Sequence, residues 1–452
     1  MTDQQQPTVA QPVGNDDPQP LPADTRREPK SGIAVTLTQA QSLLAHLGTV
    51  TSLIPSSKGY NNCLYLATIS SPTGTTAAVV KAGGWCWSRV KTEAEVAGLA
   101  VVGAAGTVPV PRVLAWRSTG NPELAAIERM PGVALADLWP RLSPAHRRDA
   151  VVQIARIVGK AKTGDAARAL VTKGAIGNLS VRHGPVAHAA GPPQVDDVTA
   201  GAMVDGGLGP WTDYEGQPAA MRYLTDTTRA AVATLRSPAL DVLQDMRDRF
   251  TARIDAYVAA LDGGAPVPGS KLPVDPAAWA AVPLELVHGD LTLKNVLVTV
   301  PGTDLAMRAD DPLTLAATSD LALDQGVQVS ALIDLEWMGV FPWADEHRVS
   351  YEFVKPDEIA DVFGLDGVPA AVRAEVEELQ ALFYDILESE YGLPTPRSRA
   401  QEWSWLTGAI AVRDAIAPWW MKNLVDQSAP EHGPKATACE RELDAALVAM
   451  GF

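Results

Sequence analysis

The segment LELVHGDLTLKNVLVTV holds the residues whose types and spacing most clearly suggest chemistry. An apolar run, which predicts a strand, leads into His288, Gly289 and Asp290. Asn295 follows five residues after the aspartate, before a second apolar run. Phosphoryl transfer needs a carboxylate that orients the attacking hydroxyl and accepts its proton, and an oxygen ligand that holds Mg²⁺ on the phosphates. Asp290 can fill the first role and Asn295 the second.

A second carboxylate, Asp334, ends the apolar run in SALIDLEWMG. We expect this run to form a strand beside the first pair, which would aim Asp334 at the same place as Asp290 and Asn295. A carboxylate and an amide oxygen that converge there would form a divalent-metal site. Each aspartate alone could simply cap a turn after a strand. Their combination with Asn295 and with the flanking strands favours the metal site.

The patterns upstream of these residues predict a small sheet with one long helix. CLYLATIS and AAVVKAG have the composition of strands, and SPTGT between them is a turn. VKTEAEVAGLAVVGAAG predicts a helix with Val96, Leu99 and Val102 on one apolar stripe. The extended VPVPRVLAW and the apolar LAAIE follow, and the Pro-Gly break after them predicts a hinge.

Beyond the hinge the sequence predicts a mainly helical region. A helix should begin after Ser143, an N-cap type of residue, and others lie near residues 237–262 and from about Pro369 onward. Residues 165–235 contain many glycines and are expected to be irregular. VLVTV and VQVSALID should form a hairpin with a surface insertion at 301–326.

Composition narrows the class of protein. The chain has 452 residues and a formal charge of -16, so it would repel a nucleic-acid backbone. An acidic surface suits a cationic small substrate, although acidity also serves solubility. Cys63, Cys86 and Cys439 lack the spacing of a zinc site or a disulfide framework, which favours a cytoplasmic location. We see neither an export signal nor a membrane-spanning segment.

HGDLTLKN and IDLE resemble the motifs HGDLxxxN and IDxE of the aminoglycoside phosphotransferase and choline kinase-like family. The resemblance implies an α+β, two-lobed protein-kinase-like fold. Its small N-terminal lobe would contain an antiparallel sheet plus a helix, and its larger C-terminal lobe would be mainly helical. We therefore predict a disordered tail at 1–33, a nucleotide-binding lobe at 34–130, and a catalytic and substrate-binding lobe at 131–452.

The same resemblance implies roles for the catalytic and metal-binding residues. Asp290 would be the catalytic base, and Asn295 and Asp334 would bind Mg²⁺. Glu336 is a weaker candidate for the metal neighbourhood. His288 is expected to brace the loop, because Asp290 already has the base role.

The nucleotide, ATP by this resemblance, would be bound by the small lobe. Lys81 in AAVVKAG would reach the phosphates and pair with a glutamate of the following helix. AEVAGL resembles the family's helix and favours Glu95, whereas spacing alone leaves Glu93 open. The remaining candidates are Gly59 and Asn62 of SSKGYNNCLYLA, which is similar to GxxNxxY, and the hinge backbone from Glu128 to Met130.

These residues predict an ATP- and magnesium-dependent kinase that transfers the γ-phosphate to a hydroxyl of a small molecule, such as an aminoglycoside, an amino sugar or a related metabolite. Candidates for binding the acceptor are the 205–220 loop, Asp345 and Glu346, and the 400–425 helices, where acidic groups could bind an amine. A nucleotide-binding pseudokinase that acts as an interaction module is an alternative, against which the intact aspartates argue. A protein kinase is disfavoured because GxGxxG and DFG elements are missing, so the tripeptide APE at 429–431 has no DFG before it.

Overall fold

The computed structural model describes residues 33–56, 59, 61–83, 90–182, 184–204, 207–237, 244–263, 267–302, 323–347, 370–399, 401–417 and 432–452. Apart from Ile33, the predicted disordered tail lies outside these residues, as do Cys86 and most of the predicted insertion at 301–326. Within the described ranges, no helix is both long and apolar enough to cross a bilayer.

The N-terminal lobe is built on a six-stranded antiparallel sheet in the order β1-β2-β3-β5-β4-β8. The predicted hairpin pairs over its full length, from Asn62 with Gly83 to Ser71 with Gly74. The elements are α1 (Leu37–Leu44), β1 (Thr49–Pro55), β2 (Asn62–Ser71), β3 (Gly74–Gly83), α2 (Val90–Gly103), β4 (Val113–Arg117), β5 (Leu124–Glu128) and β8 (Ala189–Ala190). β1 was not predicted, because this edge strand is only half-buried and its alternation is weak.

The C-terminal lobe combines two small sheets with many helices. One sheet has the order β10-β13-β7-β9 and the other β12-β11-β6. Their strands are β6 (Val133–Ala134), β7 (Gly177–Val181), β9 (Val198–Ala200), β10 (Leu284–Val287), β11 (Val296–Thr299), β12 (Gln328–Leu332) and β13 (Gly339–Pro342). The predicted hairpin is β11 with β12, and β6 after the hinge pairs with β11.

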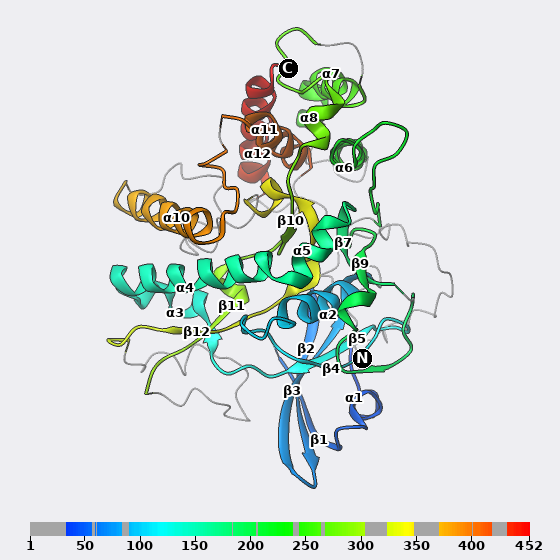
Figure 1. Ribbon diagram of the computed structural model, residues 1–452, viewed down its shortest axis with the longest axis vertical. Coiled ribbons are helices and arrows are strands. Elements are labelled where there is room, and N and C mark those ends of the chain that lie inside the picture. Colours follow the sequence, from blue (N-terminus) through cyan, green and yellow to red (C-terminus); the bar gives the residue numbers. More distant parts are fainter. Residues whose placement is uncertain are drawn as a thin grey trace, which may run out of the picture.

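The helices of this lobe form two groups (Figure 1). α4 and α10 lie side by side next to β11 and β12, with α3 beside β11 and α5 beside α4. The helices α6, α7, α8, α11 and α12 gather at the end of the molecule farthest from β1, β2 and β3. The α-helices are α3 (Leu135–Leu138), α4 (Pro144–Thr163), α5 (Asp165–Thr172), α6 (Ala219–Leu235), α7 (Gln244–Leu261), α8 (Pro276–Ala280), α10 (Ala370–Tyr391), α11 (Ser404–Ile416) and α12 (His432–Met450). Ser143 caps α4 as predicted, because its side chain accepts a hydrogen bond from the His146 N–H.

The prediction that residues 165–235 are irregular was wrong. They contain α5, the strands β7, β8 and β9, and α6. The strands have two to five residues each, and β7 and β8 pair with β13 and β4, which are distant in sequence, so local periodicity could not reveal them. α6 was missed because threonines stand on its buried face. Thr227, for example, satisfies its hydroxyl on the Tyr223 carbonyl oxygen.

Helix α2 is buried on all sides, rather than on the single predicted stripe. Every residue from Lys91 to Val102 is buried. A helix buried all round must have packing partners on every face. The partners of α2 include β4 and β5 of its own lobe, together with β7 and the turn Leu335–Trp337 (η6) of the C-terminal lobe. The two lobes therefore meet on this helix.

The pKa of Glu123, which hydrogen-bonds Thr92 in the first turn of α2, makes stability depend on pH. Burial, the largest cause, and the nearby Glu93 charge raise this pKa from 4.5 to about 7. Between those values the folded protein keeps a proton that the unfolded chain releases, so stability should fall as pH rises from about 4.5 to 7. Glu123→Gln should be more stable than the wild type at pH 8, by about 1–2 kcal/mol, and equal to it near pH 4.5. Urea unfolding of both proteins at both pH values measures this difference. The same difference in free energy of unfolding at pH 4.5 and pH 8 would contradict the prediction.

Candidate active site

The catalytic-type loop connects β10 to β11 and depends on one glycine. Gly289 has φ +80°, and a Cβ there would lie 2.8 Å from the Trp337 carbonyl oxygen. A larger residue would be strained in conformation and would also meet backbone. After Asp290 the chain makes a short 3₁₀ turn, Leu293–Asn295, closed by a bond from the Asn295 N–H to the Thr292 carbonyl oxygen.

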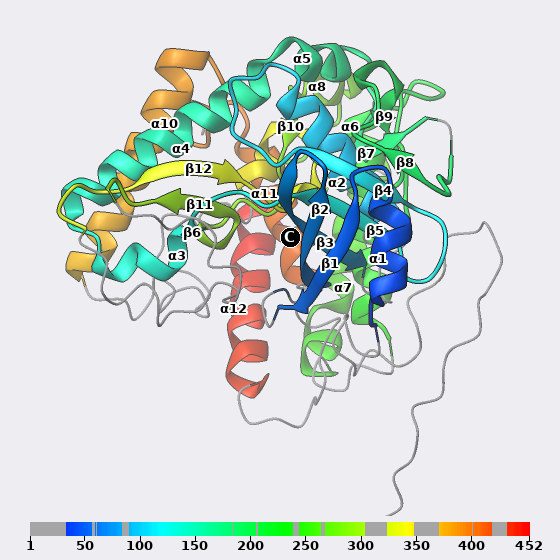
Figure 2. The same ribbon diagram turned by 90° about the horizontal axis from the view of Figure 1, so that it is seen from below.

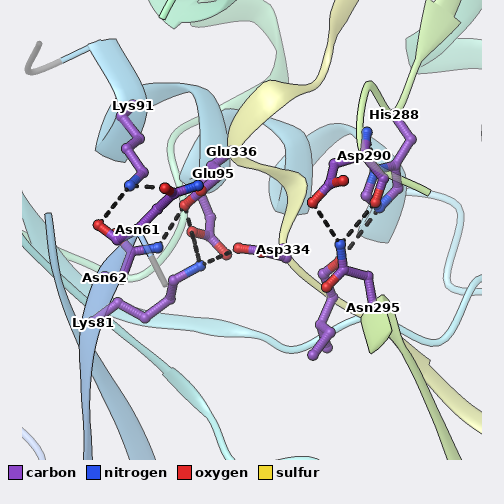
Figure 3. A network of polar contacts seen from close by, with 11 residues as sticks. Asn61, Asn62, Lys81, Lys91, Glu95, His288, Asp290, Asn295, Asp334 and Glu336 are labelled. Atoms are coloured by element: carbon purple, nitrogen blue, oxygen red, sulfur yellow. Dashed lines mark hydrogen bonds and ion pairs between the residues drawn. The ribbon is translucent and has the colours of Figure 1, made fainter. Parts of the chain in front are cut away.

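The structure brings Asp290 and Asn295 into direct contact (Figure 3). Asn295 Nδ2 donates to Asp290 Oδ2 at 2.9 Å and to the Asp290 carbonyl oxygen at 2.7 Å. Asn295 is buried, whereas Asp290 is half-buried. The amide therefore fixes the orientation of a carboxylate that solvent can still reach.

His288 braces this loop from behind. Its Nδ1 accepts the Asp290 N–H at 3.3 Å, so Nε2 carries the proton and donates to the Ile333 carbonyl oxygen at 3.3 Å. Burial lowers the pKa of His288, which keeps the ring neutral and compatible with this tautomer. The Ile333 N–H in turn donates to the Asn295 carbonyl oxygen at 2.9 Å. The catalytic loop is thus joined to the segment that carries Asp334.

Lys81, on β3, lies at the centre of a group of carboxylates. It donates to Glu95 of α2, and to Asp334 Oδ1 at 2.7 Å, and Glu336 Oε2 lies 3.6 Å from its Nζ. Glu93 has different partners, Ser118 Oγ at 2.7 Å and Ser180 Oγ at 3.1 Å. The contact that sequence spacing left open is therefore made by Glu95.

The protonation of this group follows from burial and from Lys81. Burial raises the pKa of Glu95 to about 7, and the neighbouring carboxylates add to the effect. Burial also opposes ionisation of Asp334, but the charge and hydrogen bond of Lys81 outweigh it and lower that pKa. Asp334 adopts a left-handed conformation, φ 64° and ψ 53°, which is uncommon outside glycine and turns its carboxylate toward Lys81.

Glu336 connects this group to the loop between β1 and β2. It is 1% exposed and accepts from Asn62 Nδ2 at 2.7 Å. Lys91 Nζ lies 3.5 Å from its other oxygen and donates to the Asn61 carbonyl oxygen. Gly59, with φ +91°, makes the preceding turn. Sequence reasoning ranked Glu336 low and missed Lys91, because a lysine at a helix start is usually exposed.

The oxygen atoms of this group suit a hard cation. Glu95, Asp334 and Glu336 each place a carboxylate oxygen within 4.8 Å of the others. Glu95 Oε1 is buried and makes no hydrogen bond with the described residues. The two predicted metal ligands were Asp334 and Asn295. Asn295 lies with Asp290 on the side of Asp334 that faces away from Lys81 (Figure 3). Asp334 is thus the carboxylate between Lys81 and the catalytic loop, and Mg²⁺ fits the donor chemistry.

The hinge residues lie where β5 ends. The Glu128 N–H donates to the Arg112 carbonyl oxygen at 2.8 Å, and its side chain accepts from Arg112 Nε at 2.9 Å. Met130 is half-buried, just before β6. The N–H and side chain of Glu128 therefore bond to Arg112, which leaves its carbonyl and the Met130 backbone as the candidate groups for a ligand.

The hypothesis that Asp345 and Glu346 bind an amine of the acceptor was wrong. Both carboxylates are buried and have partners within the chain. Asp345 Oδ1 accepts from Arg413 at 2.7 Å and lies 3.2 Å from the Tyr223 hydroxyl. Glu346 Oε2 accepts the His288 N–H at 3.0 Å and lies 3.1 Å from Lys162 Nζ.

Lys162, on α4, supplies a second buried cation behind the catalytic loop. It contacts Glu346 and also Glu285 Oε2, at 2.8 Å. Burial opposes its charge, but the two carboxylates outweigh burial and raise the pKa of Lys162. Burial likewise opposes ionisation of Glu346, but the Lys162 charge and the hydrogen bond from the His288 backbone N–H lower its pKa. Burial raises the pKa of Glu285. The Lys162 charge therefore supports the carboxylate that bonds the catalytic-loop backbone.

Two lobes that meet at Lys81, with an HGD loop and a braced aspartate, define the protein-kinase-like class of phosphotransferases. Residues 53–306 match the model of the Phosphotransferase enzyme family, a span of more than half of the chain. The chain belongs to this family of phosphotransferases. The match includes Lys81, Glu95 and Asp290 and ends before Asp334.

Comparison with curated proteins finds no match. Among solved structures, the chain is similar to a Plasmodium vivax ethanolamine kinase, at 9% identity and a TM-score of 0.41 over 88% of this chain and 82% of the other. It is also similar to spectinomycin phosphotransferase in complex with ADP and spectinomycin, at 9% identity and a TM-score of 0.39 over 91% and 98%. A third is aminoglycoside-3'-phosphotransferase of type VIII, at 16% identity and a TM-score of 0.37 over 86% and 98%.

The buried lysine behind the loop should be a large contributor to stability. Lys162→Met leaves Glu285 and Glu346 buried without their cation, so it should lower the free energy of unfolding by about 3–5 kcal/mol. Lys160→Met, on the exposed side of the same helix, is the matched control and should change it by less than about 0.5 kcal/mol. Denaturant unfolding compares the two, and equal stability of both variants would contradict the assignment.

Proposed function

We propose that this protein is an ATP- and magnesium-dependent kinase that transfers the γ-phosphate to a hydroxyl of a small molecule. The observation that carries the proposal is that separate elements deliver Lys81, Asp334 and the Asp290–Asn295 pair to neighbouring positions. A lysine for phosphates, a carboxylate for a cation and an oriented base are the groups that phosphoryl transfer requires. We also propose a cytoplasmic location, which rests on the cysteine pattern alone.

Asp290 acts as the base in this proposal. Its carboxylate accepts the proton of the acceptor hydroxyl as that oxygen bonds to the terminal phosphorus and the bond to the nucleoside diphosphate breaks. Asn295 holds Oδ2 in place, and His288 holds the loop backbone without exchanging protons. This arrangement works by positioning, and no covalent bond to the protein is formed.

Lys81 and the carboxylates around it form the donor side of the proposed site. Lys81 would bind phosphate oxygens, with Glu95 holding its ammonium group in position. Asp334 and Asn295 would hold Mg²⁺, which when bound neutralises charge on the phosphates. The carbonyl of Glu128 and the backbone of Met130 would bind the adenine edge. Gly59 and Asn62 belong to the loop that would cover the phosphates, with Asn62 tied to Glu336.

The acceptor is proposed only as a hydroxylated small molecule, with an aminoglycoside, an amino sugar or a related metabolite as candidates. A cationic acceptor remains part of the proposal on the strength of the acidic surface. Its carboxylate partners must be residues other than Asp345 and Glu346, because these two are paired inside the lobe.

Two aspartates should separate chemistry from nucleotide binding. Asp290→Ala should reduce phosphate transfer by about 10²–10⁴-fold and leave binding of magnesium-ADP nearly unchanged, because the base acts on the acceptor. Asp334→Ala should lose transfer and also weaken magnesium-ADP binding. Calorimetric titration with turnover assays measures both, and an equal loss of binding in the two variants would refute this division of roles.

Turnover with candidate acceptors tests the function itself. Magnesium-dependent release of ADP from ATP should rise when a suitable aminoglycoside, amino sugar, choline, nucleoside or other hydroxylated metabolite is added, and the rise should vanish in Asp290→Ala. ATP binding without stimulation by any acceptor would favour the alternative, a nucleotide-binding pseudokinase that acts as an interaction module.

A further inference from the structure

Residues 177–200, excluding 183, which lies outside the described residues, connect the two lobes a second time, in addition to the hinge. β7 and β9, which begin and end this segment, belong to the sheet of the C-terminal lobe, whereas β8 extends the sheet of the N-terminal lobe. Figure 2 shows β8 beside β4, with β7 and β9 next to them. We call this segment the lobe strap.

The strap is bonded firmly at both ends. On the C-terminal side, β7 pairs with β13, and Asn178 Nδ2 donates to the Trp337 carbonyl oxygen at 2.7 Å, three residues after Asp334. On the N-terminal side, Ala189 and Ala190 pair with β4, and the Val186 carbonyl oxygen accepts the Ser118 N–H at 2.9 Å. The strap therefore links the segment that carries Asp334 to the far edge of the other lobe's sheet.

Glu93 joins helix α2 to the strap. It is 4% exposed, and its two oxygens accept from Ser180 of β7 and from Ser118. Ser118 Oγ also accepts the Val186 N–H at 2.9 Å. The Glu93 carboxylate therefore bonds the strap directly at Ser180, and indirectly at Val186 through the Ser118 hydroxyl. The other faces of α2 are covered as well, since its neighbours include β4, β5 and η6.

The spacing of Glu93 and Glu95 along α2 connects the strap contact to the Lys81 ion pair. Residues two apart in an α-helix lie about 200° apart around its axis, so Glu93 and Glu95 point in nearly opposite directions. Glu95 reaches Lys81 on one side while Glu93 is held by the strap on the other. Whatever fixes Glu93 also fixes the rotation and depth of the helix that presents Glu95.

We propose that the lobe strap positions α2 through Glu93, and thereby holds the Lys81–Glu95 pair ready for the nucleotide. Glu93 is a positioning residue in this proposal, because it contacts the strap and not the reacting groups. The proposal rests on the proposed function only for its effect on nucleotide binding. The anchoring of the helix stands independently of it.

Amide hydrogen exchange of the full-length protein without nucleotide tests the anchoring. Exchange across residues 90–103 should become about tenfold faster in Glu93→Ala and change less in Glu93→Gln, which keeps one acceptor oxygen. Ser180→Ala removes a single hydroxyl and should give a smaller change in the same direction.

Thr199→Ala is the matched control, because Thr199 pairs with Ser180 across the strap. This variant should leave the exchange of residues 90–103 unchanged. Unchanged exchange in both Glu93→Ala and Ser180→Ala would overturn the proposal. If Glu93→Ala does not fold, Ser180→Ala alone decides.

Binding of magnesium-ADP tests the route of the effect. Glu93→Ala should raise Kd about fivefold to tenfold in the wild-type background and leave it nearly unchanged in a Glu95→Gln background, because Glu93 acts through Glu95. An equal rise in both backgrounds would show a general loss of structure and refute positioning. If the wild type does not bind magnesium-ADP at all, the proposed function fails while the exchange experiment still decides the strap.

Discussion

The ion pair between one buried lysine and carboxylates from two lobes is the interaction on which the rest of this structure depends. Lys81 comes from the small sheet and Glu95 from α2, whereas Asp334 and Glu336 come from the turn after β12. A buried ammonium group without partners is costly, and so are buried carboxylates that repel one another. The arrangement is stable only while all these elements stay in place, so the site fixes how the lobes meet.

The same principle is used a second time behind the catalytic loop. Lys162 holds Glu285 and Glu346, and Glu346 bonds the His288 backbone. The two cations serve different ends, because Asp334 retains partial solvent access beside Lys81, whereas the carboxylates around Lys162 are buried. Proximity of titratable groups therefore does not by itself mark a ligand site. Partial exposure of one carboxylate, Asp334, distinguishes the group around Lys81 from the fully buried group around Lys162.

Helix α2 shows how the supporting structure and the site are joined. It carries Glu95, and it is buried on every face because the lobe strap and the η6 turn cover the sides that its own sheet leaves open. A functional site needs its side chains held within about 0.5 Å of the productive geometry. In this protein the means of holding them includes a segment whose three short strands belong to two different sheets.

The sequence by itself determined the order of the elements and the identity of the central residues. HGDLTLKN between two apolar runs indicated the catalytic loop, and the hairpin with Lys81 and the helix with Glu93 and Glu95 were predicted with the correct types. These signals are local, since strand alternation, helical spacing and turn residues act over a few residues. The family match covers residues 53–306, which include this loop, the hairpin and the helix.

Only the tertiary structure decided which partners the charged groups have. It gave Lys81 to Glu95 and not Glu93, placed Lys91 and Lys162 in the interior, and paired Asp345 with Arg413. The structure also shows that the lobe strap lies within residues 165–235, which were expected to be irregular. Its strands β7 and β8 pair with β13 and β4, which are distant along the chain. Burial and ion pairing depend on contacts between elements that are distant in sequence, and a local pattern in one sequence does not predict such contacts.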